Sequence, residues 1–458
     1  MKKIVLTIAL MAAIANVAQA QWMRVWQGEE TTRYSMSDYP TIPYDGAGST
    51  LTFGEDSYST AEIDSITIIN PVTISWTNDG ASVDIPEGVE GVTASIDGGN
   101  VIINNVNTWS EQEFILQGSS SAGSLVYRGA FKTKFHLNGV NLTSVDSAAI
   151  DIECGKRIDV ILEAGTENSF ADPSTRPNVT DDETTNGEKA AVYCKGHMEI
   201  SGGGSLTITS NYKHALVTKE YLFIKRTVGN ITIAKSVADG IHCGEYFKMN
   251  GGALVLKNIG GDGIQVETKA TGKTEEELNG QFIMNGGSID LTLSAPSTKG
   301  IRLDDDAYTE LVDGKMVSHD ATVVPEMYIN DGTIKVNLTA KALGTKAIAS
   351  DGNFTIGTTE TSPTITIDLY ADWDADEERA TGLKATQTLL IAGGNTVVNA
   401  IGDNSRGVRA SKLRATGGTL TVKNTGEDSQ GIKLDRNNPF NPFEGGTVKG
   451  SISYSKPN

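Results

Sequence analysis

The sequence contains few of the residues that usually cross-link or interrupt a chain, with three cysteines and twelve prolines in 458 residues. Three cysteines are too few and too widely spaced for a disulfide framework or a zinc cluster. Aromatic residues are also scarce, at 6%, and acidic residues outnumber basic ones, which gives a formal net charge of −19. Because nucleic-acid binding needs a basic footprint, the composition excludes nucleic acid as a partner. It is compatible with binding of divalent cations, or with simple extracellular solubility.

Long apolar runs are absent except at the N-terminus. Lys2 and Lys3 precede an apolar stretch from Ile4 to Ala18, and Ala18-Gln19-Ala20 offers small residues for cleavage. This pattern predicts a signal peptide over residues 1–20. No later apolar run is long enough to cross a membrane. We therefore expect an exported protein without a membrane span, in the periplasm, at the cell surface or outside the cell, and a monomer.

Glycine, in contrast, is abundant, with fifty residues, and much of it recurs in one repeated unit. Residues 250–266 read as a Gly-Gly turn, an alternating strand, a second glycine turn and a second strand. Where nothing is inserted, these units recur about every two dozen residues, the length of one turn of a β-solenoid. Similar units begin at Gly203, Gly229, Gly251, Gly286, Asp331, Gly393, Gly417 and Gly445.

The repeat predicts an all-β fold, a single-stranded parallel β-helix over residues 71–458. One repeat has too little apolar surface to fold alone, whereas stacked repeats bury a continuous column of Ile, Leu and Val. Residues 21–70 are predicted to form a short N-terminal strand region that caps this body. Within them, the stretch EIDSITI at residues 62–68 loosely resembles a short motif in the leader of exported Bacteroidetes surface proteins, which would make this region a docking segment. Insertions at 268–280 and 304–325 are expected to form outer loops.

The cysteines fit the repeat as inward-facing residues. Cys154, Cys194 and Cys243 each lie two residues after the apolar residue of the second strand. Because side chains alternate along a strand, this position faces inward. We interpret them as buried, inert thiols. A disulfide between Cys154 and Cys194 stays open as an alternative.

Several motifs in a fixed order resemble a known family. They read LNGVNL at residues 137–142, AAIDI at 148–152, VILEAGTEN at 160–168 and GSL at 204–206, followed by DGI at 239–241 and again at 262–264. They are similar to the bacterial carbohydrate-binding β-helix family whose founder comes from a cellulolytic clostridium, over roughly residues 130–435. The resemblance implies a right-handed parallel β-helix, bound calcium and binding of plant-type polysaccharides, notably polygalacturonate. It also implies a fold like that of calcium-dependent pectate lyases.

Five aspartates are candidate calcium ligands, because calcium prefers six to eight oxygen atoms. Asp239 and Asp262 occupy equivalent corners of neighbouring repeats, which would place them roughly 4.8 Å apart. Two carboxylates at that distance repel each other unless a cation or proton lies between them. The alternative is an Asp-Gly turn whose side chain caps its own backbone. Asp304, Asp305 and Asp306 form the second candidate, with a solvated turn as the alternative.

Basic residues recur at outward and corner positions of the later repeats, where the DGI motif disappears. In an acidic protein they predict a basic stripe that could bind the carboxylates of an acidic polysaccharide. The alternative is a solvated face paired with Asp304, Asp351 and Asp435. The seven candidate binding residues are Lys299, Arg302, Lys346, Lys384, Arg406, Arg409 and Lys433.

Three functions remain open at this point. The first is a non-catalytic protein that binds acidic polysaccharide with the help of calcium. The second is a calcium-dependent pectate lyase, for which Arg302 or Lys299 near Asp304 would be the place to look for a base. The third is a structural or adhesive surface protein. No nucleophile motif is present, and the five histidines show no metal-binding spacing.

Overall fold

A computed structural model of the protein describes residues 22–27, 30–35, 38, 50–176, 189–269, 278–312, 315–373, 378–435 and 445–454. The predicted signal peptide lies outside these residues. Nearly all regular structure in them is β-strand. Within these ranges, no helix is long and apolar enough to cross a membrane.

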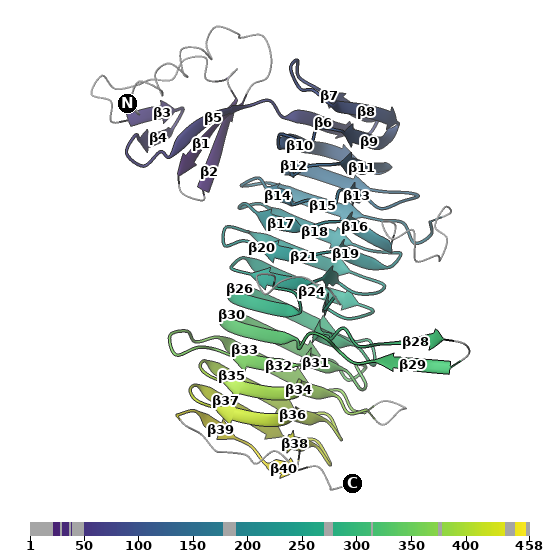
Figure 1. Ribbon diagram of the computed structural model, residues 1–458, viewed down its shortest axis with the longest axis vertical. Helices are drawn as coiled ribbons and strands as arrows, with labels where there is room; N and C mark the ends of the chain where they lie inside the picture. The colour runs from purple at the N-terminus through teal and green to yellow at the C-terminus, as the bar shows by residue number, and fades with distance from the viewer. Residues whose placement is uncertain are drawn as a thin grey trace.

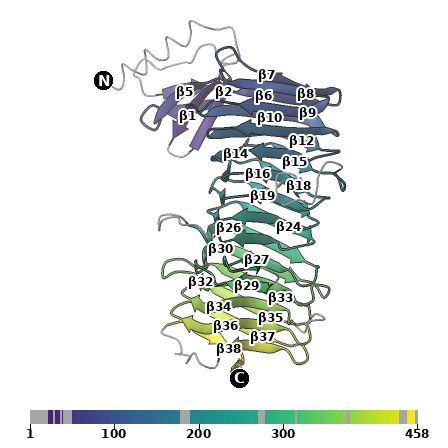
Figure 2. The same cartoon turned by 45° about the vertical axis from the view of Figure 1, so that its right-hand side comes forward.

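Most strands stack in three parallel ladders that run the length of an elongated body (Figures 1 and 2). One rung of the body passes through the third, the first and then the second ladder. The first ladder consists of β6 (Val72–Thr77), β10 (Gln112–Ser120), β12 (Thr133–Thr143), β14 (Ile158–Leu162), β17 (Met198–Ser201), β20 (Leu222–Ile224), β23 (Tyr246–Met249), β26 (Gln281–Leu293), β30 (Glu326–Leu338), β32 (Asn353–Ile356), β34 (Thr381–Ile391) and β36 (Arg406–Ala415).

The second ladder shares the long strands β12, β26 and β30 with the first. Its other members are β15 (Glu167–Ala171), β18 (Ser205–Thr209), β21 (Asn230–Lys235), β24 (Ala253–Ile259), β33 (Thr364–Leu369), β35 (Asn395–Ala400), β37 (Thr419–Asn424) and β39 (Thr447–Lys449).

The third ladder shares β34 and β36 with the first, and it carries most of the candidate site residues. Its other members are β9 (Gly99–Asn105), β11 (Gly123–Gly129), β13 (Ile150–Glu153), β16 (Ala190–Cys194), β19 (His214–Thr218), β22 (Ile241–Gly244), β25 (Ile264–Glu267), β27 (Lys299–Leu303), β31 (Lys346–Ser350), β38 (Gln430–Leu434) and β40 (Ile452–Tyr454).

These shared strands correct the predicted fold class, a right-handed single-stranded parallel β-helix with a short N-terminal strand cap. Because long strands bend from one ladder into the next, 33 of the described strands form one continuous sheet that closes around a single core. Extra antiparallel strands are added at its N-terminal end, where β7 (Gly80–Asp84) pairs with β6 and β8 (Val92–Asp97) pairs with β9. The repeat predicted the parallel pairing but neither the continuous closed sheet nor these additions.

The N-terminal region is more than a strand cap, because it has a sheet and a core of its own. The strands β1 (Trp22–Gln27), β2 (Glu30–Ser35) and β5 (Ser65–Ile69) pair antiparallel, beside the hairpin of β3 (Thr50–Phe53) and β4 (Asp56–Ser59). Arg24 of β1 connects this unit to the main body through two hydrogen bonds to the Glu113 carboxylate of β10. The core consists of Met23, Val25, Tyr34, Leu51, Phe53 and Tyr58.

The second predicted insertion carries the antiparallel hairpin of β28 (Tyr308–Val312) and β29 (Lys315–His319). Figure 1 shows this hairpin extending away from the stacked rungs. Residues 270–277 of the first insertion lie outside the described residues. The insertions therefore leave the ladders continuous, since β25 pairs directly with β27, and β27 with β31.

Inward-facing side chains confirm the predicted alternation. Ile241, Ile264 and Ile301 stack in register and are at most 1% exposed. All three cysteines are buried and free, as predicted for inert thiols. The alignment placed Cys154 incorrectly, however, because Ile152 rather than Cys154 pairs with Cys194.

The DGI motif requires glycine because the backbone of the next rung lies too close for a side chain, not because φ is positive there. A Cβ atom on Gly240 would lie 2.7 Å from the carbonyl oxygen of Gly263, and one on Gly263 would lie 2.4 Å from that of Gly300. Positive φ occurs instead in the Gly-Gly turns, for example 79° at Gly252 and 84° at Gly287. The two glycine-rich turns of each repeat therefore have different physical causes.

Candidate functional site

Two columns of side chains run along the outside of the third ladder. The corner column holds one residue at the start of each strand or two positions before it, and the outward column holds the residue three positions later. Pairing in the ladder fixes both columns in register. From rung to rung, the corner column reads His214, Asp239, Asp262, Lys299, Lys346, Thr381, Arg406 and Gln430. The outward column reads Val217, His242, Gln265, Arg302, Ala349, Lys384, Arg409 and Lys433.

The later rungs of both columns form a basic cleft with a volume of about 240 Å³. Four of the seven predicted binding residues line it, two from each column. Arg379, which the sequence analysis missed, precedes β34 and adds a fifth cation. The basic cleft is lined by Lys346, Glu378, Arg379, Thr381, Lys384, Arg406 and Arg409.

Three of the cations in the basic cleft have acidic partners. Lys346 pairs with Glu378. Lys384 Nζ lies 3.4 Å from Asp351 Oδ1, and Arg409 Nη1 lies 2.6 Å from Asp435 Oδ1. The predicted alternative of a face paired with Asp351 and Asp435 is therefore correct for Lys384 and Arg409. Because the acidic partners neutralise part of the stripe, the remaining cations determine the charge of the cleft.

Arg406 and Arg379 make no ion pair within the part of the chain that the structure describes. Arg406 Nε donates a hydrogen bond of 3.0 Å to the Gln430 side chain, and Arg379 Nη1 donates to the Asn404 carbonyl at 2.5 Å. Burial, together with repulsion from Arg409 and Arg379, lowers the pKa of Arg406 to about 10. Crowded, partly buried guanidinium groups of this kind favour an anion between them.

An aromatic residue, Trp373, lies next to Arg379. The guanidinium carbon of Arg379 lies 5.6 Å from the ring centre of Trp373, whose side chain is 40% exposed. Exposed aromatic rings offer an apolar face with a polar edge. Trp373 and Arg379 belong to a polar insertion between β33 and β34. A tryptophan in an otherwise acidic insertion was the signal that could have identified this edge of the cleft.

The other three predicted basic residues lie outside the basic cleft. Lys299 pairs in register with Lys346 but does not line the cleft. Lys433 Nζ donates a hydrogen bond of 2.6 Å to the Tyr454 carbonyl. Arg302 is bound by Asp304 and by Asp262, whose Oδ2 lies 3.2 Å from Nη1. Ala349 interrupts the outward column between Arg302 and Lys384, so the stripe is not continuous.

The aspartate corners bind the backbone of the next rung. Asp239 Oδ1 accepts a hydrogen bond of 2.8 Å from the N–H of Asp262, and Asp262 Oδ1 accepts one of 2.7 Å from the N–H of Lys299. Burial and the neighbouring charge of Asp239 raise the pKa of Asp262. The two aspartates thus form a ladder of caps between rungs, whereas the predicted alternative had each side chain cap the backbone of its own turn.

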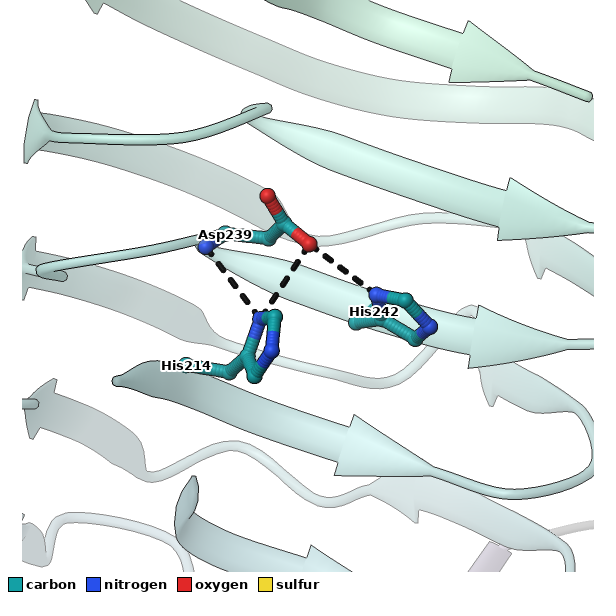
Figure 3. Close-up of side chains that lie close together, drawn as sticks. All are labelled: His214, Asp239 and His242. Carbon is teal, nitrogen blue, oxygen red and sulfur yellow. Dashed lines mark hydrogen bonds and ion pairs between the residues drawn. The ribbon is translucent and has the colours of Figure 1, made fainter. Parts of the chain in front are cut away.

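The second oxygen of Asp239 faces two histidines (Figure 3). His214 Nδ1 lies 3.1 Å and His242 Nδ1 lies 2.9 Å from Asp239 Oδ2. His242 Nε2 lies 3.1 Å from Glu267 Oε1. Burial acts to lower the pKa of His242, but the hydrogen bonds to Asp239 and Glu267 outweigh it and raise this pKa to about 9. The same two histidines hold the pKa of Asp239 well below its usual range, against the effect of burial.

The three consecutive aspartates point to different partners. Asp304 accepts hydrogen bonds from Arg302 and, at 3.0 Å, from Gln265. Asp305 Oδ1 accepts one of 3.2 Å from the N–H of Ala307, and Asp306 caps the backbone at 322–323. Burial raises the pKa of Asp304 to about 6, although Arg302 acts to lower it.

These contacts do not fit the predicted calcium sites well. Calcium binds six to eight oxygen atoms, but the carboxylate oxygens of these aspartates already have other partners. Asp239 and Asp262 accept hydrogen bonds from backbone N–H groups, and Asp262 also accepts one from Arg302. Asp306 accepts a hydrogen bond from the Thr322 hydroxyl. Nitrogen donors from His214 and His242 are not ligands that calcium prefers. Calcium binding at these five aspartates therefore stays a prediction, and no chemical step is derived from it.

Comparison with known proteins identifies the family. A family model described as a carbohydrate-binding domain-containing protein matches residues 97–429. A carbohydrate-binding domain-containing protein of Acetivibrio thermocellus is 31% identical over 103 residues, which are 22% of this chain and 35% of the relative, so the chain spans about a third of that relative's length. Among solved structures, a gadolinium derivative of the polysaccharide lyase-like protein from C. thermocellum is similar, with a TM-score of 0.44 and 19% identity over 69% of this chain and 99% of the other. Because the family model matches more than half of the sequence, the chain belongs to the family of carbohydrate-binding domain-containing proteins.

Proposed function

We propose that this carbohydrate-binding protein binds an acidic polysaccharide, such as polygalacturonate, in the basic cleft. Family membership supports a polysaccharide as the partner. The observation that carries the acidic specificity is the charge of the cleft, where Arg379 and Arg406 have no acidic partner among the described residues and repel each other. A uronate carboxylate between them would relieve this repulsion.

The chemistry of the cleft suits a uronic acid chain. A guanidinium group can hold a carboxylate through two parallel N–H donors, which adds geometric selectivity to the charge attraction. Lys384 and Arg409 lie on neighbouring strands of the ladder, roughly 4.8 Å apart at the backbone, so cations repeat along the body axis. The exposed ring of Trp373 could pack against the apolar face of a sugar ring.

Equilibrium binding of size-defined oligogalacturonates, measured by calorimetry, tests this proposal. The Arg406→Gln variant should bind at least about tenfold more weakly, since hydrogen bonds to charged groups contribute about 1.5–3 kcal/mol. The matched control is Lys423→Gln, because Lys423 is an exposed base on β37 in the same rungs but outside the cleft. Equal affinities for wild type and Arg406→Gln, or equal binding of a neutral glucan, would reject the proposed specificity of the basic cleft for an acidic polysaccharide.

Calcium assistance is a separate part of the proposal. A divalent cation could bridge a uronate carboxylate and protein oxygens, even though the predicted aspartates already have partners. The same titration with calcium and with a chelator tests this part. Stronger binding in calcium supports it, whereas identical affinities would leave direct arginine binding as the mechanism.

Export and a monomeric state also belong to the proposal. An apolar N-terminal stretch followed by small residues is typical of secreted proteins, and extracellular polysaccharide would be the accessible partner. Fractionation of cells that produce the full chain, with N-terminal sequencing of the product, would test cleavage after Ala20. Light scattering of the same product would test the monomer.

Lyase activity is the second candidate, and one observation favours it. The carboxyl group of Asp304 has a pKa of about 6, close to the value that suits a general base near neutral pH. Arg302, in contrast, is held by Asp262 and Asp304 and stays protonated. Incubation with polygalacturonate and calcium should then produce unsaturated sugar that absorbs in the ultraviolet. The Asp304→Asn variant should abolish this product, and no product from wild type would reject the lyase.

A further inference from the structure

We propose that His214, Asp239 and His242 form a binding site for a transition-metal ion of borderline softness, with Zn²⁺ as the probe. This site is distinct from the basic cleft and does not depend on the proposed polysaccharide. It uses two histidines that the sequence analysis considered scattered. The three ligand atoms, two histidine Nδ1 atoms and one carboxylate oxygen, all lie within 4.8 Å of one another.

The distances fit a tetrahedral ion. Zn–N and Zn–O bonds of about 2.0–2.2 Å separate neighbouring ligand atoms of a tetrahedron by roughly 3.3 Å. Asp239 Oδ2 lies 3.1 Å from one histidine Nδ1 and 2.9 Å from the other. A movement of a few tenths of an ångström would admit the ion. The side chains of His214, Asp239 and His242 are 16%, 12% and 18% exposed, so a fourth position can be reached by water or a ligand.

Surrounding hydrogen bonds fix how the two rings face Asp239. The backbone N–H of Asp239 donates to His214 Nδ1 at 3.3 Å, so the lone pair of this nitrogen lies at the Asp239 corner, and a metal ion would take it over from this long hydrogen bond. Glu267 Oε1 lies 3.1 Å from His242 Nε2 and accepts its N–H, so a metal ion that replaces the Nδ1 proton of this ring would find Nδ1 already aimed at Asp239 Oδ2. Three electron-rich atoms that converge in this way need a cation or protons between them.

The three candidate ligands are also held by hydrogen bonds on the sides that face away from the ion, as is usual for the ligands of a metal site. A carboxylate on the far nitrogen of a metal-binding histidine fixes its tautomer and orientation, and Glu267 occupies this position at His242. The other oxygen of Asp239 is held by the N–H of Asp262 at 2.8 Å. Adjacent rungs of a closed sheet therefore hold each ligand at a fixed orientation (Figure 3). Such support favours an ion that prefers nitrogen and oxygen in a tetrahedral arrangement over calcium.

Metal titration of the full, chelator-treated protein tests the site. Calorimetry with Zn²⁺ should show one ion per chain, and Co²⁺ should give the visible absorption of tetrahedral coordination. The single variants His214→Gln and His242→Gln should weaken zinc binding by at least about 100-fold, and Glu267→Gln by about tenfold. A large excess of Ca²⁺ should not displace the zinc.

Matched controls keep the test decisive. His319→Gln changes a histidine on the projecting hairpin and should leave zinc affinity unchanged. Circular dichroism and the melting temperature of each chelated variant report whether it is folded. Zinc binding that survives in the His214→Gln/His242→Gln double variant would place the ion elsewhere, for example at His197 and Glu220, and would overturn the proposal. Displacement of the zinc by the same large excess of Ca²⁺ would overturn it as well.

Discussion

The middle and the C-terminal rungs of the third ladder use the same two columns for different side-chain chemistry. In the middle rungs, corner and outward positions hold His214, Asp239 and His242, which converge on one point. In the later rungs, the same columns hold Lys346, Lys384, Arg406 and Arg409, which surround a basic cleft. The backbone is equivalent in both places, so side-chain identity alone changes the chemistry. A repetitive scaffold can thus carry two separate sites along one face.

Between these regions lies a neutralised boundary. Arg302 binds both Asp262 of the middle rungs and Asp304 beside the insertion. Ala349 follows on the next rung, and it leaves a position without charge. The two sites are therefore separated by an internal ion pair and by a small residue. This separation leads us to expect that they bind their ligands independently.

The largest effect is expected from reversing the charge of the basic cleft. Arg406→Glu would place a carboxylate where the ligand carboxylate should bind, so oligogalacturonate affinity should fall by more than about 100-fold. The control Lys423→Glu introduces the same charge change outside the cleft. Affinity electrophoresis in a polygalacturonate gel measures both variants. Similar migration shifts of the two variants would break the contrast between cleft and surrounding surface.

Asp304, which pairs with Arg302 between the two regions, should make the free energy of unfolding depend on pH. The pKa of Asp304 is raised to about 6 from 3.8, so ionisation costs more in the folded chain than in the unfolded one. The contribution of Asp304 to the free energy of unfolding is full below pH 3.8 and decreases as the pH rises to about 6, by about 3 kcal/mol at most.

Chemical denaturation at several pH values measures this dependence. In Asp304→Asn the free energy of unfolding should no longer decrease between pH 4 and 6. The variant should therefore become more stable relative to wild type as the pH rises over this range. The conservative variant Asp305→Asn, one residue along, should keep the wild-type slope. Parallel curves for wild type and Asp304→Asn would show that Asp304 is not the buried titrating group.

The middle rungs should be sensitive to a single added methyl group. In Gly263→Ala the new Cβ would lie 2.4 Å from the Gly300 carbonyl oxygen, so the neighbouring rungs must separate, at a cost of about 1–3 kcal/mol in the free energy of unfolding. Gly155→Ala is the matched control, because no atom lies within 4 Å of its added Cβ. Equal unfolding free energies of the two variants would contradict the proposed close packing at the Asp-Gly corner.

The smallest expected effect is a difference between the two sites in how their binding affinities depend on salt concentration. Raising the ionic strength from about 0.05 to 0.5 M should weaken oligogalacturonate binding by about tenfold, because exposed charges are screened. Zinc binding at the partly buried histidines should change by less than about twofold, since direct coordination is screened much less. Calorimetric titrations at both salt concentrations provide the comparison. Equal salt dependence would indicate that both ligands bind by surface charge alone.

Much of the third ladder could be predicted from sequence, because the period of the repeat places residues in register. It brought Lys384, Arg409 and Lys433 into one column, and the pairing confirms this. The same period could not show partners from outside the repeat, such as Arg379 and Trp373, which belong to the irregular insertion between β33 and β34. Nor could it show that Asp239 binds the next rung's backbone, since that depends on the rotamer rather than on spacing.

The histidine site was missed because its spacing belongs to the fold rather than to a local motif. His214 and Asp239 occupy the same corner on adjacent rungs, and His242 lies three residues further along. Their separation in sequence therefore combines one full rung with one short strand. The closed sheet was missed for a related reason, because strands that bend between ladders leave no distinct mark in the alternating pattern.

The most direct test of two independent sites on one face is a two-ligand titration of the chelated full chain. Oligogalacturonate affinity is measured with and without saturating zinc, in wild type, Arg406→Glu and the His214→Gln/His242→Gln double variant. We predict equal sugar affinities with and without zinc, loss of sugar binding only in Arg406→Glu, and loss of zinc binding only in the double variant. Loss of both ligands in either variant, with each protein still folded, would contradict the separation of the two sites.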